Sequence, residues 1–218
     1  MTNDELVELE NQLSCPFGKN GKKLGQTMAE SNQQMILETI GLLKSNNHQT
    51  ILEIGHGNAS HLSSMFKFLN PKKYYGLEIS EVMHQEAIQN NIDLVKKKLV
   101  EFKRNSDHNL TFSNGFFDQI FTINTIYFFD DLTNVLIEFH RVLKIKGLLT
   151  ITFVSAETMK PLAFVKQKFK LYEKDDLVEF VKKIGFKFHQ ISEKIEEAKS
   201  KDGKIVSRKY YIIQFVKI

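Results

Sequence analysis

The 218-residue sequence contains a single cysteine, Cys15, so it cannot form an internal disulfide. Its first ten residues, MTNDELVELE, are acidic and mixed, whereas a secretory signal peptide begins with basic residues followed by an apolar stretch. No run approaches the roughly 18 to 20 consecutive apolar residues that a membrane-spanning helix needs. We therefore expect a cytoplasmic protein without a transmembrane segment.

Arginine is also scarce, because only Arg104, Arg141 and Arg208 occur among the 30 basic residues. Proteins that read nucleic acids depend on the bidentate hydrogen bonds of arginine, so this scarcity argues against a nucleic-acid partner. The 26 acidic residues leave a net charge of +4, which is too small for a nucleic-acid-binding surface. The length fits one globular domain, and 42% hydrophobic residues are enough to form its core.

Short apolar runs alternate with helical patterns in the middle of the chain. Runs without a clean polar alternation occupy residues 50–54, 74–79, 99–102, 119–124 and 148–154 and predict strands buried on both faces. Between the last two runs, apolar residues spaced at three and one over 132–143 predict a helix with one buried face. This alternation predicts an α/β fold, a Rossmann-like open parallel sheet with helices on both faces.

The two ends of the chain differ from this pattern. Residues 20–45 predict one or two helices, preceded by a loop that contains Pro16. A helix over 175–184, ended by Gly185, precedes two long strand-like runs at 186–195 and 205–218. Asp202-Gly203 lies between these runs and is typical of a tight turn, so the sheet should end in an antiparallel β-hairpin.

Two glycines follow the first predicted strand, in Glu53-Ile54-Gly55-His56-Gly57. In an open α/β sheet the first strand-to-helix turn is a usual ligand site, and glycine lets the backbone approach a ligand closely. The second predicted strand ends near Glu78, whose carboxylate can accept hydrogen bonds from both hydroxyls of a ribose. Together these features predict a nucleoside-containing cofactor, although an ordinary turn and a solvated surface Glu are the alternatives.

A dinucleotide-binding loop would carry a third glycine where this chain has Ser60. A nicotinamide-dependent oxidoreductase is therefore disfavoured but stays open at this point. Later motifs separate the two classes of cofactor.

With its later motifs the chain resembles class I S-adenosylmethionine-dependent methyltransferases, and most of all the small-molecule group of the ubiquinone and menaquinone biosynthesis enzymes. The matching motifs are Glu53-x-Gly55-x-Gly57, Glu78, Ser106-Asp107-His108, Phe117-Asp118-Gln119-Ile120-Phe121 and Glu138-x-x-Arg141-Val142-Leu143, in the family's order over residues 50–154. The chain departs from the family at Ala59, where a third glycine is usual, and at Ile145-Lys146, where Pro-Gly is usual. The resemblance implies the seven-stranded methyltransferase fold and S-adenosylmethionine as cofactor.

The resemblance also implies a division of one domain, 1–218, into three parts. These are an N-terminal helical cover (1–49), a cofactor-binding sheet (50–154) and a cap segment with the C-terminal hairpin (155–218). The expected cofactor-binding residues are Glu53, Gly55, His56, Gly57, Glu78, Ile79, Met83, Ser106, Asp107, His108, Asn124 and Thr125. The expected substrate-binding residues are Phe17, Met28, Tyr127 and Phe128, with simple packing as the alternative for each.

The implied activity is methyl transfer to a small-molecule acceptor by in-line displacement. Because orientation of the reactants supplies much of the rate acceleration, a catalytic base is optional, and the sequence identifies none. A cofactor-binding protein without activity is a further alternative. His and Cys residues show no metal-ligand spacing, so we expect no metal.

The segment 155–172 carries four lysines among apolar residues. It could admit an anionic or lipid-like substrate or touch an anionic membrane surface. The alternative is an amphipathic cap helix with a solvated lysine face, which we favour.

Overall fold

The computed structural model describes residues 1–43, 48–104, 110–199 and 205–218. Its centre is a seven-stranded sheet in the order β3-β2-β1-β4-β5-β7-β6. The strands are β1 (Thr50–Ile54), β2 (Lys73–Glu78), β3 (Val100–Arg104), β4 (Phe117–Ile123), β5 (Leu143–Val154), β6 (Phe186–Lys199) and β7 (Ile205–Lys217). Strands β1 to β5 are parallel, whereas β7 is antiparallel to β5 and to β6. The predicted parallel sheet with a terminal antiparallel hairpin is confirmed; its Asp202-Gly203 turn lies outside the described residues.

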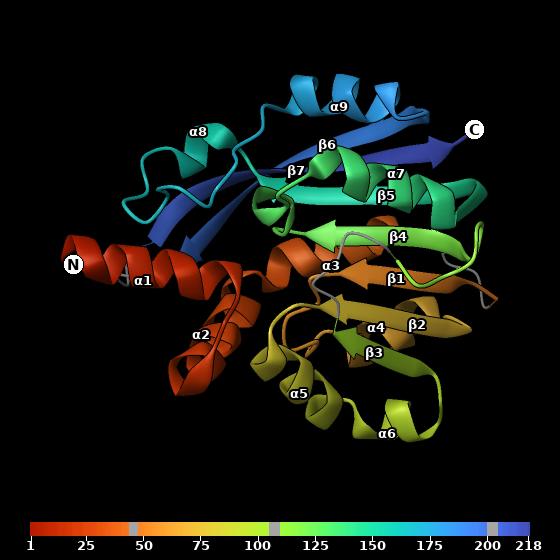
Figure 1. Ribbon diagram of the computed structural model, residues 1–218, viewed down its shortest axis with the longest axis horizontal. Helices are drawn as coiled ribbons and strands as arrows, with labels where there is room; N and C mark the ends of the chain where they lie inside the picture. The colour runs from red at the N-terminus through yellow and green to blue at the C-terminus, as the bar shows by residue number, and fades with distance from the viewer. Residues whose placement is uncertain (44–47, 105–109, 200–204) are drawn as a thin grey trace.

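Helices cover both faces of this sheet (Figure 1). They are α1 (Asn3–Ser14), α2 (Gly18–Ser31), α3 (Gln33–Leu42), α4 (Leu62–Leu69), α5 (Glu81–Asn90), α6 (Ile92–Lys96), α7 (Leu132–Val142), α8 (Ala156–Met159) and α9 (Lys174–Lys183), with a 3-10 turn at Ile126–Phe128. None of the helices within the described ranges combines the length and the apolar character needed to cross a membrane.

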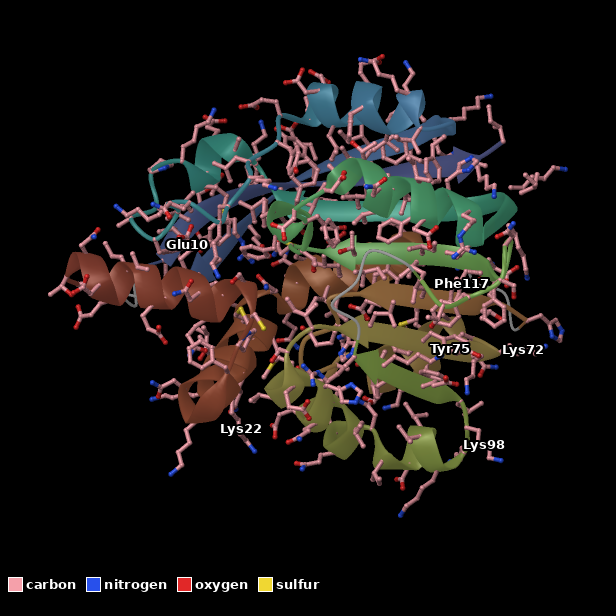
Figure 2. The ribbon with its side chains drawn as sticks, viewed as in Figure 1. Glu10, Lys22, Lys72, Tyr75, Lys98 and Phe117 are labelled. Carbon is pink, nitrogen blue, oxygen red and sulfur yellow. The ribbon has the colours of Figure 1, made fainter. Side chains whose placement is uncertain are left out.

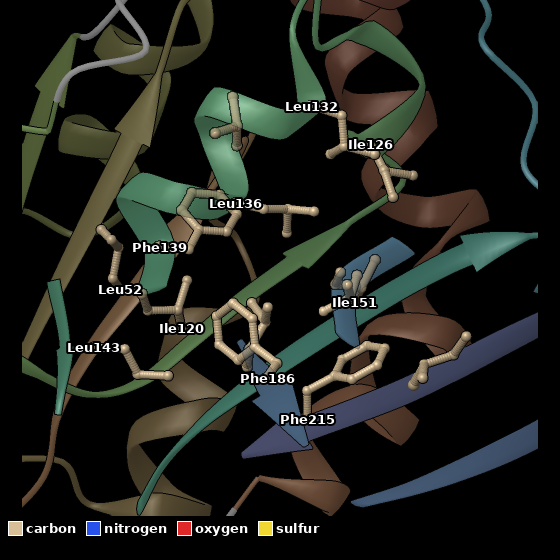
Figure 3. Close-up of a cluster of buried hydrophobic side chains, with 14 of the residues drawn as sticks. Leu52, Ile120, Ile126, Leu132, Leu136, Phe139, Leu143, Ile151, Phe186 and Phe215 are labelled. Carbon is tan, nitrogen blue, oxygen red and sulfur yellow. The ribbon is translucent and has the colours of Figure 1, made fainter. Parts of the chain in front are cut away.

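The larger core lies between the sheet and the pair α7 and α9. Leu136 and Phe139 of α7 pack toward Ile120 of β4 and Ile151 of β5, as Figure 3 shows. These side chains are at most 2% exposed. The 3-1-3-3-1 spacing predicted this helix because it places the residues Leu132, Val135, Leu136, Phe139 and Val142 on one buried face. A second core on the opposite face joins α3, α4 and α5 to β1, β2 and β4.

The N-terminal helices lie at the carboxyl ends of the parallel strands. In Figure 1, α1 and α2 stand beside the arrowheads of β1, β2 and β4. Helix α1 was not predicted from the sequence, although Thr2 and Glu5 form a capping box at its start. The strand order reverses between β1 and β4, so this cover lies at the position where α/β folds bind ligands.

The segment that follows β5 is not the amphipathic helix that we favoured. After one short helix, α8, residues 160–173 run without helix or strand. The backbone N–H groups of Lys166 and Lys168 donate to Oε1 of Glu10 on α1, each at 2.9 Å. The buried carboxylate of Glu10 therefore accepts hydrogen bonds from backbone N–H groups of this segment. If the segment were helical, its own carbonyl groups would accept them.

Candidate active site

The turn after β1 contains two glycines with positive φ, which are 75° at Gly55 and 57° at Gly57. A Cβ at Gly55 would lie 2.2 Å from Oγ1 of Thr125, so glycine is needed there for contact with the end of β4. A Cβ at Gly57 would meet no atom within 4 Å. The turn therefore leaves an open cradle beside Gly57, into which a ligand can be placed against the backbone.

Glu78 ends β2 next to this turn and is 7% exposed. Its Oε2 accepts a hydrogen bond from the backbone N–H of Gly57 at 3.0 Å, and its Oε1 accepts from those of Ile79 and Ser80. Burial raises the pKa of this carboxyl above its ordinary value, although the three backbone donors oppose the shift. A carboxylate oxygen can accept two hydrogen bonds, so Oε2 keeps a free position toward the cavity.

Glu53 lies behind the glycine turn and is 3% exposed. Its Oε2 accepts from the Tyr74 hydroxyl at 2.5 Å and lies 2.9 Å from Nε2 of His61. Burial alone would raise the pKa of Glu53, but His61 and the Tyr74 hydroxyl outweigh it and lower the pKa. Glu53 is thus a buried anion that anchors the start of α4 to β2.

His56 lies between the two glycines and is 4% exposed. Its Nδ1 lies 2.7 Å from the carbonyl oxygen of Gly57, and its ring centroid is 4.7 Å from that of Phe102. Burial lowers the pKa of His56 to about 4, so the imidazole is neutral near pH 7. A neutral ring whose Nδ1 donates to Gly57 holds the turn in place.

These residues line one cavity of about 310 Å³ at the carboxyl ends of β1, β2 and β4. Small-molecule sites occupy about 300–1,000 Å³. The predicted site residues that line it are Met28, Glu53, Gly55, His56, Gly57, Glu78, Ile79, Met83, Asn124, Thr125 and Phe128. The cavity therefore brings together residues that the sequence places up to about 100 positions apart.

The cover closes the cavity through contacts between α2 and α5. A Cβ at Gly25 would lie 2.4 Å from Cε and Sδ of Met83, so the two helices meet as closely as glycine allows. Nearby, Lys22 Nζ lies 2.8 Å from Oε1 of Glu86, and the Ser80 hydroxyl donates to a carbonyl of the loop before α2. The loop and α2 are thus bound to the element that follows Glu78.

Two expected substrate residues do not line the cavity. Phe17 is 52% exposed and lies outside it. Tyr127 is 2% exposed, and its hydroxyl accepts from the backbone N–H of Val154 at 2.6 Å and donates toward Oδ1 of Asn124 at 3.1 Å. Burial raises the pKa of Tyr127 far above its ordinary value, which does not suit a proton acceptor. Tyr127 therefore joins β5 to the end of β4.

Ser106, Asp107 and His108 lie outside the described residues, so their expected role stays a prediction. Several lining residues did not emerge from the sequence as site residues: Gly25, Ile36, Asn58, His61 and Asp130. For Gly25, the spacing Gly21-x-x-x-Gly25 on α2 was a signal in the sequence. Glycines one helical turn apart allow another helix to approach closely. Within the described ranges, no cluster of three or more His, Cys, Asp or Glu residues could hold a metal.

The chain was compared with known proteins. Residues 52–151 match the family described as a methyltransferase domain. The chain is 28% identical over 133 residues to the uncharacterized methyltransferase YdaC of Bacillus subtilis, covering 61% of this chain and 71% of that protein.

Solved structures with low identity share the fold. The YcgJ protein of Bacillus subtilis superimposes with a TM-score of 0.66 at 16% identity, covering 86% of this chain and 98% of YcgJ. Geranyl diphosphate C-methyltransferase of Streptomyces coelicolor, solved with S-adenosylhomocysteine, gives 0.66 at 14% identity over 93% of this chain and 87% of that one.

The family match covers the parallel part of the sheet from β1 into β5, with the glycine turn and Glu78, and the fold neighbours cover most of the chain. The match ends at Ile151, before the cap segment and the hairpin begin. Residues 52–151 thus match a methyltransferase domain, and the chain has the fold of a solved methyltransferase.

Proposed function

We propose that the cavity beside Gly57 and Glu78 binds S-adenosylmethionine and that the protein methylates a small-molecule acceptor. The observation that carries this proposal is the buried Glu78 carboxylate, held by three backbone N–H groups with one oxygen still able to accept. A ribose hydroxyl can donate to the free position on such a carboxylate. The open cradle at Gly57 gives the ligand room next to the same group.

The residues present fit the two ends of this cofactor. Ile79 and Leu110 line the cavity past Glu78 and supply apolar surface for a base. Asn124 and Thr125 line it at the end of β4, where the amino-acid end would lie. The positions of His56 and Met83 support the same arrangement, because His56 holds the glycine turn and Met83 contacts the cover.

S-adenosylmethionine supplies a methyl group that is already electrophilic, so the chain's main task is orientation. The glycine turn and Glu78 fix one reactant, while Met28 and Phe128, which also line the cavity, restrict the other. The close contact of α2 with α5 excludes water from the space between them. Orientation of this kind supplies about 7–11 kcal/mol in well-aligned reactions.

The size and the mainly apolar lining of the cavity favour a small molecule as the methyl acceptor. Its lining beyond Thr125 is mainly apolar, with Met28, Ile36, Phe128 and Phe129. The covering helices leave a partly open cavity of about 310 Å³, whose size suits a small molecule. An apolar acceptor of the kind that quinone-biosynthesis methyltransferases use is consistent with this wall.

Calorimetry with S-adenosylmethionine, S-adenosylhomocysteine and NAD tests the proposal. We expect both sulfur compounds to bind and NAD to bind weakly, since Ser60 replaces the third glycine of a dinucleotide loop. Binding of NAD with no binding of the sulfur compounds would refute the proposal. Transfer of labelled methyl groups to a panel of quinone precursors and apolar amines would then identify the acceptor class.

A further inference from the structure

We propose that Asn32 binds the carboxylate of the cofactor's amino-acid end and that Arg208 is a positioning residue for Asn32. This inference rests on the proposed function, because it assigns a further contact to the same cofactor. Asn32 lies at the junction of α2 and α3, and Arg208 lies on β7, 176 positions later in the chain.

Arg208 is held rigidly in the terminal hairpin. Its Nε donates to Oε1 of Glu196 at 2.8 Å, and the side chains of Arg208 and Glu196 are 14% and 2% exposed. The same guanidinium reaches the α2–α3 junction, where Nη1 donates to Oδ1 of Asn32 at 3.0 Å and Nη2 donates to the carbonyl of Ser31 at 2.8 Å. One buried fork therefore connects the hairpin to the cover.

The hydrogen bond from the Arg208 guanidinium determines the orientation of the Asn32 amide. A guanidinium can only donate hydrogen bonds, so the atom of Asn32 that faces it must be the oxygen. The Nδ2 group then points away from Arg208 and makes no hydrogen bond within the described part of the chain. Since Asn32 lines the cavity, it presents an unused N–H donor there.

The position of Asn32 matches the far end of the cofactor. Met35, one turn further along the chain, accepts a hydrogen bond at its Sδ from Nδ2 of Asn124, so the α2–α3 junction stands over the end of β4. Glu78 ends β2, and β1 lies between β2 and β4. The α2–α3 junction therefore lies over the strand two places away from the one that ends in Glu78.

The charges around the cavity leave few other groups for a carboxylate. Its lining contains Glu53, Glu78 and Asp130, and no lysine or arginine among the described residues. A carboxylate placed there needs N–H donors that are not offset by a nearby anion. Asn32 supplies one, and Arg208 polarises its amide from behind through the bond to Oδ1.

The experiment uses Asn32→Asp, because aspartate keeps an oxygen for Arg208 and so keeps the junction. It removes the Nδ2 donor and adds a negative charge that faces the cofactor's carboxylate. The two probes are S-adenosylhomocysteine and its decarboxylated analogue, which keeps the amine and lacks only the carboxylate. Calorimetry on the full chain gives the ratio of the two dissociation constants for the wild type and the variant.

We expect Asn32→Asp to weaken binding of S-adenosylhomocysteine by 10-fold or more and to leave binding of the decarboxylated analogue unchanged or stronger. Arg208→Lys, which cannot hold Glu196, Asn32 and Ser31 together, should change the ratio in the same direction by a smaller factor. Asn20→Asp, an exposed change of the same charge on α2, should leave the ratio at its wild-type value.

An equal loss for both probes, or no loss for either, would overturn the inference, because only a contact with the carboxylate separates them. Such a result would leave the proposed function standing as long as the wild type binds S-adenosylhomocysteine. Failure of the wild type to bind either probe would instead refute the proposed function.

Discussion

The backbone N–H of Gly57 donates a 3.0 Å hydrogen bond to Oε2 of Glu78, which joins the turn after β1 to the end of β2. Each residue marks the carboxyl end of its own strand, and the two strands are neighbours in the sheet. This bond places a backbone cradle and a carboxylate side by side. The first two predictions concern its two partners.

Glu78→Gln should weaken binding of S-adenosylhomocysteine by about 1–3 kcal/mol, because it replaces a charged acceptor of a ribose hydroxyl with a neutral amide. Burial raises the pKa of Glu78, so wild-type affinity should also begin to fall at a higher pH than the ordinary carboxyl range. Calorimetry from pH 8 to pH 5 measures both effects. Glu179→Gln on the exposed face of α9 is the control. Unchanged affinity in Glu78→Gln would show that Glu78 is only a structural acid.

Gly57→Ala should separate binding from stability. The new Cβ meets no protein atom within 4 Å, so only the positive φ opposes it, at a cost of about 1–2 kcal/mol. The same Cβ would occupy the cradle and should weaken cofactor binding at least 10-fold. Gly55→Ala, whose Cβ would collide with Thr125, should lower the free energy of unfolding much more. Urea unfolding and calorimetry on both variants check this contrast, and equal destabilisation would contradict it.

Glu10→Ala should release the cap segment from α1. Burial alone would raise the pKa of Glu10, but the backbone N–H groups of the segment 166–169 outweigh it and lower the pKa. Figure 2 shows Glu10 on the side of α1 that faces this segment. Loss of the acceptor should cost about 1–3 kcal/mol and speed hydrogen exchange over residues 160–172. Glu8→Ala, exposed on the same helix, should leave that exchange rate unchanged.

The stabilising effect of the Glu10 carboxylate should depend on pH. Because the pKa is lowered in the folded state, this stability is present above the ordinary carboxyl pKa and is lost as the pH falls through the folded value. The difference in unfolding free energy between wild type and Glu10→Ala should therefore shrink below about pH 4. A constant difference would show that folding does not lower the pKa of Glu10.

Gly25→Val should push α2 away from α5, because its side chain would enter the space that Met83 fills. We expect faster proteolysis of the N-terminal cover and weaker cofactor binding. Gly41→Val on α3 is a matched control, since a Cβ there meets no atom within 4 Å. Limited proteolysis followed by mass spectrometry measures the effect. Similar cleavage in both variants would rule out the close contact as the cause.

Because of His56, the free energy of unfolding should decrease in mild acid. Because burial lowers its pKa from 6.5 to about 4, the unfolded chain takes up a proton before the folded protein does. The contribution is thus present above pH 6.5 and is lost as the pH falls toward 4. Between pH 7 and pH 5 the wild type should lose about 2 kcal/mol more unfolding free energy than His56→Asn. Urea titrations check this, with the exposed His189→Asn behaving like the wild type.

The sequence by itself determined the alternation of strands and helices between β1 and β5. It also identified the glycine turn after β1 and Glu78 at the end of β2. Buried parallel strands need apolar runs, and a backbone that approaches a ligand needs glycine, so both leave local patterns in the chain. The helix at α7 was predicted for the same reason, because its periodicity lies within eleven residues. Most of the expected cofactor residues that lie in described positions follow from these patterns and do line the cavity.

Only the tertiary structure decided how the distant segments meet. Tyr127 was expected at the substrate, yet its hydroxyl binds the backbone of Val154, 27 residues away. The cap segment is held in an irregular form by Glu10, and Arg208 orients Asn32 across 176 positions. The local sequence around a lysine-rich run or a single asparagine does not predict which distant residue it will contact. Such contacts form only when the sheet and its helices pack together. Packing brings together donors and acceptors that lie far apart in the sequence.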